Sequence, residues 1–351
     1  MGKARVFVLQ GYYGTGNFGD DWLLSAAIGT IARAAPGARF VVRDHGDAVP
    51  LDGAGQVIFT GSERVLSNQT MPRLSRLRRY VTDAWRQFGG ADWLVFGGGT
   101  QFHGSGGTTS LALNALLCIL ARLRGVRVAA LGIGVKGTES AAARALLAVI
   151  VRCSSVFAVR DEASQSAAGN AAIAGADLAF TAPLPPPARH GGAIAVAVYP
   201  HAWSTSLADS LAAALQGREV VLLEVQRAGV TEGDGQVLDM LSAGLPGSER
   251  RRMVPDGSSF DGVGLVCGMR FHALLAAAQA GLPFVGIAHD PKIADLCARF
   301  AMPCLAPERA TADAIAAAIA DGAGRSPSPE ALARCIEEAR RGPDALARAL
   351  A

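Results

Sequence analysis

Short apolar runs rich in valine, leucine and phenylalanine alternate along the chain with longer runs rich in alanine and leucine. Short apolar runs of this kind are typical of parallel strands that are buried on both faces. In the first half of the chain the pattern predicts strands at residues 6–9, 40–43, 57–60, 93–96, 127–131 and 156–159, and helices at about 21–34, 73–88, 110–124, 139–152 and 161–168. Strands that alternate with helices predict a doubly wound α/β domain.

The pattern stops at residues 183–187 (PLPPP) and starts again after residue 192. Consecutive prolines cannot lie in a central strand, so residues 183–191 are predicted to form a stiff linker. Beyond it we predict strands at 193–198, 219–224, 264–267 and 284–287, helices at 206–215 and 235–243, and a closing helix near 329–350.

We therefore predict two Rossmann-like, doubly wound α/β domains, residues 1–182 and 192–351, that face each other across a cleft. Ligands of open α/β sheets bind outside the carboxyl ends of the strands, so the candidate chemistry should follow the strands.

Composition narrows the class of protein. Of 351 residues, 50% are hydrophobic and 18% are charged, which excludes intrinsic disorder as the main state. The net charge of +3 gives no indication of nucleic-acid binding. Six scattered cysteines without CxxC spacing predict reduced thiols and no metal site. With no apolar signal segment at the N-terminus, and with residues 111–121 too short to span a bilayer, we expect a soluble, cytoplasmic protein.

The first candidate loop, residues 11–21 (GYYGTGNFGDD), follows the first predicted strand and opens a helix. Glycines allow the backbone to approach a ligand, and a helix N-terminus favours an anion. The spacing is neither a Walker A loop nor a proper GxGxxG. We favour a functional loop over a structural turn. Asp20 or Asp21, at the helix start, could alternatively serve only as the N-cap of the helix.

The second candidate loop is residues 97–104 (GGGTQFHG), again after a predicted strand. Three glycines allow close approach to a ligand or form a tight turn. His103 could titrate near neutral pH, although a lone loop histidine is more often a hydrogen-bonding surface residue.

Arg160 ends a predicted strand and is followed by Asp161 and Glu162. The planar guanidinium of arginine suits a carboxylate or phosphate ligand. An arginine paired with these neighbouring carboxylates is a nearly equal alternative.

The most informative segments are residues 268–273 (GMRFHA) and 288–293 (AHDPKI), which follow two consecutive predicted strands. Arg270 and His272, two positions apart at a helix start, suit an anionic substrate that also needs proton transfer. His289, Asp290 and Lys292 are predicted to project into the same cleft.

Residues 73–80 (RLSRLRRY) form a basic helix with leucine spacing. We favour a solvated helix face, because the run is short for a polybasic membrane signal. The alternative is contact with anionic lipid or with a phosphate-bearing acceptor.

Five elements occur together and in one order: residues 11–14 with 17–21, 97–99, 160–161, 268–272 and 290–292. In this combination the chain resembles the polysaccharide pyruvyl transferase family from residue 11 to about residue 295. The last two elements are the most specific.

The resemblance implies a ketal pyruvyl transferase with a glycosyltransferase-B-like pair of domains. Such enzymes act in the synthesis of cell-envelope polysaccharides. They take phosphoenolpyruvate, attach pyruvate as a ketal across two hydroxyls of a sugar, and release phosphate. By motif, the resemblance implies that Arg160, Arg270, Phe271 and His272 line the phosphoenolpyruvate site, with the donor side in the C-terminal domain and the acceptor side in the N-terminal domain.

This chemistry suits the residues. Two arginines can hold the phosphate and the carboxylate of phosphoenolpyruvate. His272 is the candidate acid that protonates the methylene carbon, with His289 and His103 as alternatives. Lys292 is a candidate for stabilising the leaving phosphate, and Asp20 or Asp21 for the base of the acceptor hydroxyl. No metal or organic cofactor is expected.

The acceptor is less defined than the donor. The expected acceptor-side loop residues are Gly14, Asn17, Asp21, Gly98, Gly99 and His103. Family members commonly have an acidic residue a few positions after the triple glycine, where this chain has residues 101–104 (QFHG), and a tyrosine at the position of His289. The expected partner is a sugar or glycan, lipid-linked or free, with peripheral membrane contact as an option and no nucleic acid.

Two rival functions fit the same architecture. The first is a nucleotide-sugar glycosyltransferase in which Arg270 and Lys292 hold a diphosphate. The second is a catalytically silent protein that binds anions or glycans. A fold alone does not separate these functions.

Overall fold

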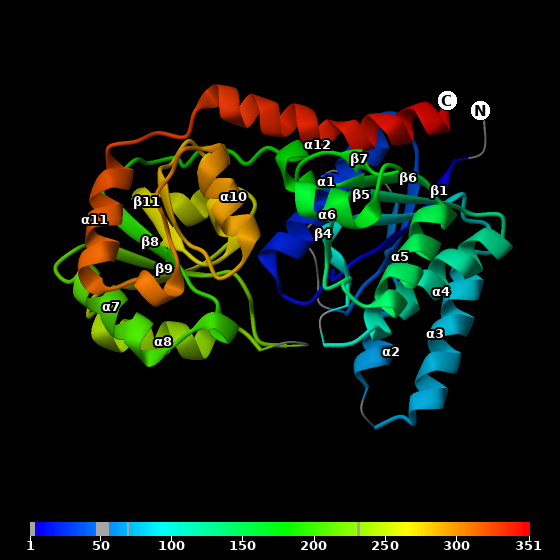
Figure 1. The fold of residues 1–351 in the computed structure, drawn as a ribbon, viewed down its shortest axis with the longest axis horizontal. Coiled ribbons are helices and arrows are strands. Elements are labelled where there is room, and N and C mark those ends of the chain that lie inside the picture. The colour runs from blue at the N-terminus through cyan, green and yellow to red at the C-terminus, as the bar shows by residue number, and fades with distance from the viewer. Residues whose placement is uncertain (1–3, 47–55, 69, 105, 230–231) are drawn as a thin grey trace. The chain divides into compact units, whose positions relative to one another are not determined.

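The computed structural model describes residues 4–46, 56–68, 70–104, 106–229 and 232–351, and the chain divides into two compact units (Figure 1). The first unit consists of Met1–Thr15, Asp20–Ala182 and Cys335–Ala351. The second consists of Gly16–Gly19 and Pro183–Arg334.

This division differs from the predicted domains at two places. The closing helix was predicted to belong to the C-terminal domain, but from Cys335 onward it belongs to the first unit. There its Gly342 packs closely against Ala158. The segment Gly16–Gly19 was predicted to belong to the N-terminal domain, but it groups with the second unit, where the backbone nitrogen of Phe18 donates to the Val225 carbonyl (2.9 Å).

Within the described residues, the first unit holds a seven-stranded parallel sheet in the order β3-β2-β1-β4-β5-β6-β7. Its strands are β1 (Val6–Gln10), β2 (Arg39–Arg43), β3 (Val57–Phe59), β4 (Trp93–His103), β5 (Arg127–Lys136), β6 (Ser154–Val159) and β7 (Ile173–Ala174). This is a Rossmann-like order whose topological switch point lies between β1 and β4.

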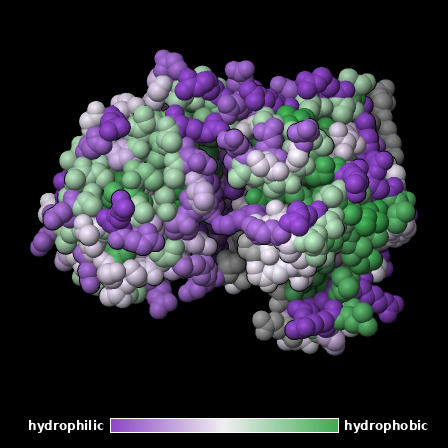
Figure 2. Space-filling model, in the orientation of Figure 1, coloured by the Kyte–Doolittle hydropathy of each residue, from purple (hydrophilic) through white to green (hydrophobic). Residues whose placement is uncertain are grey.

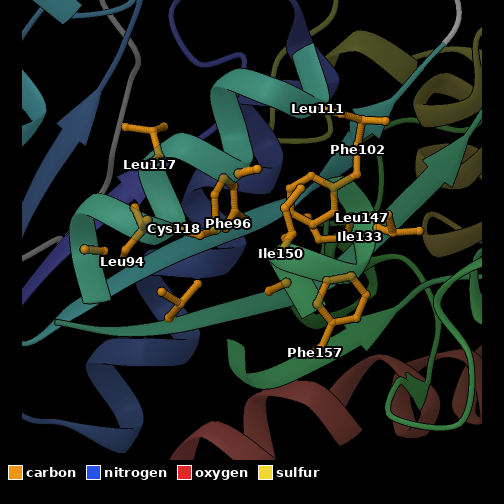
Figure 3. Packing of buried hydrophobic residues seen from close by; sticks show 14 of the residues in the cluster. Leu94, Phe96, Phe102, Leu111, Leu117, Cys118, Ile133, Leu147, Ile150 and Phe157 are labelled. Atoms are coloured by element: carbon orange, nitrogen blue, oxygen red, sulfur yellow. The ribbon is translucent and has the colours of Figure 1, made fainter. Parts of the chain in front are cut away.

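The helices of the first unit cover both faces of this sheet (Figure 1). They are α1 (Phe18–Ala34), α2 (Arg64–Ser67), α3 (Arg73–Gln87), α4 (Thr109–Leu123), α5 (Ala141–Cys153), α6 (Glu162–Ala168) and the end of α12 (Pro329–Leu350). One core lies between the sheet and α3, α4 and α5, with Phe96, Phe102 and Phe157 in edge or stacked contact (Figure 3). Helix α1 packs on the opposite face, against Gly97 and Gly98 of β4.

Within the described residues, the second unit holds a six-stranded parallel sheet in the order β10-β9-β8-β11-β12-β13. The strands are β8 (Ala193–Ala197), β9 (Val220–Glu224), β10 (Glu249–Arg252), β11 (Val263–Gly268), β12 (Phe284–Ile287) and β13 (Cys304–Leu305). This order is again Rossmann-like, with its switch point between β8 and β11.

Helices cover both faces of the second sheet as well. They are α7 (Thr205–Leu215), α8 (Gly235–Gly244), α9 (Phe271–Gln279), α10 (Pro291–Arg299) and α11 (Ala312–Ala323). Helices α7, α8 and α11 share a core with one face, and α9 and α10 contact the other face at Gly286. No helix in the described part of the chain is long and apolar enough to cross a membrane.

Candidate functional site

The carboxyl ends of β9, β8, β11 and β12 are neighbours in the second unit, and candidate residues follow two of these strands. Arg270, Phe271 and His272 come directly after β11, and His289 and Lys292 come after β12. The structure therefore gathers these five predicted residues at one sheet edge, beside the switch point where ligands of open α/β sheets bind.

Arg270 occupies the N-cap position of α9 and is held from three sides. Its Nε donates to the Val198 carbonyl (3.0 Å), its Nη2 donates to the Asp234 carboxylate, and its guanidinium lies over the Tyr199 ring, 4.7 Å from the centroid. No described residue accepts a hydrogen bond from Nη1. The cation is thus fixed in orientation, 12% exposed, and has one nitrogen to offer an anionic ligand.

The partner of Arg270, Asp234, is completely buried and was not predicted as a site residue. Its Oδ2 accepts from the backbone nitrogens of Val225 (3.0 Å) and Gln226 (2.9 Å) after β9. Burial raises the pKa of Asp234, and the nearby Arg270 opposes that rise. The only signal in the sequence was an acidic residue between two glycines ahead of a helix.

His272 lies directly against the backbone of Gly19 in the first turn of α1. A Cβ atom at Gly19 would lie 2.0 Å from the Nδ1 of His272, so no larger residue fits beside this imidazole. The helix start is fixed by Asn17, whose Oδ1 accepts from the Gly19 nitrogen (2.9 Å) and whose Nδ2 donates to Oε1 of Gln226 (2.7 Å). A residue predicted for the acceptor-side loops therefore helps to position the candidate acid.

Aromatic contacts complete this edge. The His289 ring stacks on Tyr199 with centroids 4.6 Å apart, and the Phe271 ring meets His272 edge-on at 5.2 Å. Nζ of Lys292 lies 5.7 Å from the Phe271 centroid. Lys292 and Arg270 thus place two cations near the first turns of α9 and α10, where helix dipoles also favour an anion.

The predicted acidic and glycine residues of the first unit lie around α1 and β4. Oδ1 of Asp21 accepts from the Gly14 nitrogen (3.0 Å), which fixes the glycine loop. A Cβ at Gly99 would lie 3.6 Å from Oδ1 of Asp20. Gly98 and Gly99 have φ of 83° and 76°, conformations that favour glycine, within a strand longer than the predicted one.

His103, at the end of β4, is paired with an aromatic side chain from the loop after β1. Its Nε2 lies 3.1 Å from the Tyr12 hydroxyl. His103 is therefore a hydrogen-bonding residue at the end of a strand, where the sequence predicted a loop.

Arg160 is 8% exposed and belongs to the first unit, where all three of its nitrogens have partners. Nε donates to Asp161 (3.3 Å), Nη1 to Asp177 (3.2 Å) and Nη2 to the Thr100 hydroxyl (2.7 Å). This is the arrangement of the alternative that the sequence left open, an arginine paired with carboxylates. Asp177 and Thr100 were not predicted to take part.

Among the described residues, no group of three or more His, Cys, Asp and Glu side chains is placed to hold a metal ion.

The fold of almost the whole chain is similar to that of several solved structures. A UDP-GlcNAc 2-epimerase from Methanocaldococcus jannaschii matches with a TM-score of 0.62 at 8% identity and covers 99% of both chains. The UDP-N-acetylglucosamine 2-epimerase of Rickettsia bellii matches at 0.60 and 10% identity, covering 99% of this chain and 96% of that one. Anabaena HepE in complex with UDP-glucose matches at 0.57 and 14%, covering 98% and 96%.

Together with the two Rossmann-like sheets, these matches confirm a glycosyltransferase-B-like α/β fold. The family model of polysaccharide pyruvyl transferases matches residues 17–241, well over half of the chain. The chain belongs to the polysaccharide pyruvyl transferase family, as the sequence motifs predicted. A search of curated proteins finds no match.

Proposed function

We propose that this protein transfers a pyruvyl group from phosphoenolpyruvate to two hydroxyls of a sugar or glycan, forming a ketal and releasing phosphate. Family membership supports pyruvyl transfer in general. The observation that carries the donor is Arg270, a cation fixed by Asp234, Val198 and Tyr199 at the switch point of a parallel sheet.

Phosphoenolpyruvate is a small molecule with a phosphate and a carboxylate. Nη1 of Arg270, the ammonium of Lys292 and the N-termini of α9 and α10 supply positive potential for such an anion. The resemblance adds Arg160 as a second arginine. That role requires the donor to displace one of its partners, and Asp161, with its side chain 24% exposed, is the more accessible of the two carboxylates.

In the proposed reaction His272 donates a proton to the methylene carbon, which becomes the methyl group. The first acceptor hydroxyl forms a bond to C2 and gives its proton to a base, for which Asp20 is the candidate. The C–O bond to phosphate then breaks, Arg270 and Lys292 stabilise the leaving charge, and the second hydroxyl bonds to C2 and gives its proton to the now neutral His272. His289, stacked beside this edge, is the alternative acid. The steps require no metal or organic cofactor.

The rival function is transfer from a nucleotide sugar. It is favoured by the fold shared with HepE, whose structure contains UDP-glucose. In this alternative Arg270 and Lys292 would hold the diphosphate.

The test is thermal unfolding of the protein with phosphoenolpyruvate, UDP and GDP. A ligand that binds only the native state raises Tm once the ligand concentration exceeds Kd. We expect a saturable rise with phosphoenolpyruvate and its loss in Arg270→Ala. Arg325→Ala is the matched control, since Arg325 is 43% exposed and pairs with Asp321. A rise with a nucleoside diphosphate and none with phosphoenolpyruvate would replace this proposal by glycosyl transfer.

The outer faces of α3 and α4 support a further part of the proposal, contact with an anionic membrane surface. Leu74, Leu77 and Trp85 on α3, and Ile119 and Leu123 on α4, are 40–79% exposed. Figure 2 shows apolar side chains gathered over α4 and the neighbouring part of α3. Monomeric proteins rarely expose large contiguous apolar patches, so this one indicates an interaction site.

The charge beside these apolar residues favours a lipid surface as the partner. Exposed arginines lie on the same two helices and their ends: Arg73, Arg78, Arg79, Arg86, Arg122 and Arg124. The guanidinium of Arg124 lies 4.6 Å from the centroid of the Trp85 ring, which joins the two helices into one surface. Arginine and tryptophan beside an apolar strip fit an anionic interface, where a lipid-linked acceptor would be located.

A further inference from the structure

The first unit contains a cavity of about 280 Å³ that is lined in part by Gly11 and Tyr12 of the first candidate loop and by Gln101 of the second. Its walls come from the loop after β1, from the segments after β2 and β3, from β4, and from α3 and α4. The lining residues are Gln10, Gly11, Tyr12, His45, Glu63, Leu66, Tyr80, Gln101, Thr109, Ser110, Leu113 and Asn114. Because β1 and β4 flank the switch point of this sheet, the cavity lies where an open α/β sheet binds ligands.

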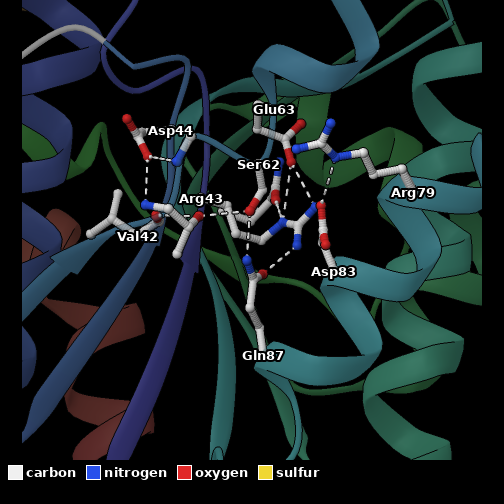
Figure 4. A network of polar contacts seen from close by, with 11 residues as sticks. Val42, Arg43, Asp44, Ser62, Glu63, Arg79, Asp83 and Gln87 are labelled. Atoms are coloured by element: carbon white, nitrogen blue, oxygen red, sulfur yellow. Dashed lines mark hydrogen bonds and ion pairs between the residues drawn. The ribbon is translucent and has the colours of Figure 1, made fainter. Parts of the chain in front are cut away.

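Four of the lining side chains are polar and more than nine-tenths buried, namely those of Gln10, Glu63, Gln101 and Asn114. Oε1 of Glu63 accepts from Nη2 of Arg43 (3.0 Å; Figure 4), and Oε1 of Gln10 accepts from Nε of the same arginine (2.8 Å). These bonds hold the two side chains in place. Buried polar groups fixed in this way are typical of a preorganised binding site.

The charge of the lining argues against an anionic ligand. None of the described lining residues is a lysine or an arginine, and the carboxylate of Glu63 is paired with the fully buried Arg43 behind it. Nη1 of Arg43 also donates to Gln87, outside the lining. Phosphate and carboxylate groups therefore find no cation here, in contrast to the Arg270 edge of the second unit.

The other walls are aromatic or carry hydroxyl groups. The Tyr12 ring stacks with His45 at 6.3 Å, and Tyr80 forms a buried wall. Thr109 and Ser110, at the start of α4, add hydroxyls. An aromatic face accepts the C–H face of a sugar ring, while carboxylate and amide groups exchange hydrogen bonds with its hydroxyls.

We propose that this cavity binds one uncharged sugar ring of the acceptor, with Tyr12 against the ring and Gln10, Glu63, Gln101 and Asn114 on its hydroxyls. The volume of about 280 Å³ suits a single ring better than a longer chain. This inference rests on the proposed function, because it assigns the sugar acceptor of that reaction to the first unit.

The experiment is saturation-transfer NMR with the methyl glycosides of glucose, galactose, mannose, N-acetylglucosamine, N-acetylgalactosamine and N-acetylmannosamine. Leu113→Trp fills the cavity, and Ala112→Trp places the same side chain at the exposed neighbouring position as a control. Asn114→Ala is the milder second variant and should weaken binding by about tenfold through one lost hydrogen bond.

We expect at least one glycoside to bind the wild type and Ala112→Trp, and not Leu113→Trp. The rise in Tm with phosphoenolpyruvate should be the same in all of these proteins, which separates this inference from the proposed donor site. Binding that persists in both Leu113→Trp and Asn114→Ala, or no binding of any glycoside by the wild type, would overturn the assignment.

Discussion

At the scale of single residues, the close contact between Gly19 and His272 allows the position of the candidate acid to be tested without mutating His272 itself. In Gly19→Ala the new Cβ would lie 2.0 Å from Nδ1, so the imidazole must move. Gly29→Ala in the same helix is the matched control, because its Cβ would lie 3.7 Å from the nearest atom, in Arg33.

We expect Gly19→Ala and His272→Gln to bind phosphoenolpyruvate but to release phosphate at least about 10²-fold more slowly, as is usual when a general acid is lost. Gly29→Ala should keep its activity and gain about 0.4–1 kcal/mol in stability. The measurement is phosphate release against acceptor concentration. Normal kcat in His272→Gln would transfer the acid role to His289.

The cysteines give a second prediction at this scale. Burial raises the pKa of the Cys267 thiol to about 12 and also raises the pKa values of Cys118 and Cys297. Because the thiolate is the reactive form, these buried thiols should resist alkylation until the protein unfolds. Exposed Cys304, whose pKa is raised less by its partial burial, should react first and faster as the pH rises from 7 to 9.

Mass spectrometry after a timed iodoacetamide pulse measures this order directly. Cys304→Ser should remove the fast phase. Early labelling of Cys267 in the native protein would contradict the buried position of β11.

Residue identity alone predicted Arg270, His272, His289 and Lys292, because cations and imidazoles after apolar strands are conspicuous in a sequence. It did not predict Asp234 or Tyr199, which hold Arg270. Their side chains become partners only when β8, β9 and β11 pair, and sequence separation hides that proximity. For Arg160 the residue types allowed both a ligand site and an ion pair. The structure shows an ion pair with Asp177 (3.2 Å), and the ligand site stays a prediction.

At the scale of elements, α3 and α4 carry the proposed membrane surface. Replacing Leu74 and Leu123 by glutamate adds two negative charges and removes two exposed apolar side chains. We expect co-sedimentation with vesicles of phosphatidylglycerol and phosphatidylcholine to fall at least about tenfold, since each charge near an anionic surface contributes about 1 kcal/mol.

Met240→Glu is the control, because Met240 is 46% exposed on α8 of the second unit. Binding of the wild type should also decrease with salt and be absent with pure phosphatidylcholine. Equal binding to both vesicle types would contradict the role of the arginines, and concentration-dependent dimers in solution would point to a second copy as the partner.

Pattern reasoning found the central strands because they are apolar throughout. It missed β10, whose sequence Glu249–Arg252 is entirely charged, because β10 pairs only with β9 at the edge of the sheet and its outward side chains remain in solvent. It also ended β4 at residue 96. The strand continues to His103 because Gly98 and Gly99 adopt positive φ and the pairing with β5 shifts register there.

At the scale of the whole molecule, the last helix belongs to two units. Gly342 of α12 packs so closely that a Cβ would lie 2.6 Å from the Cβ of Ala158 in β6. Replacing an exposed glycine inside a helix by alanine usually raises the stability of the folded protein by roughly 0.5–1 kcal/mol. We expect Gly342→Ala instead to lower Tm, whereas the control Gly29→Ala should raise it. A higher Tm for Gly342→Ala would show that the end of α12 does not pack on the first unit.

The sequence by itself determined the fold class and the family, and it predicted Arg270–His272 as a candidate site. Each of these depends on local information, namely apolar runs, glycine and proline positions, and short conspicuous clusters after strands. The tertiary structure decided which partners hold Arg270 and Arg160, to which unit Gly16–Gly19 and the end of α12 belong, and that residues from six segments enclose a cavity in the first unit. These features depend on pairing between distant segments, where burial and hydrogen bonding choose among many side chains that look equivalent in the sequence.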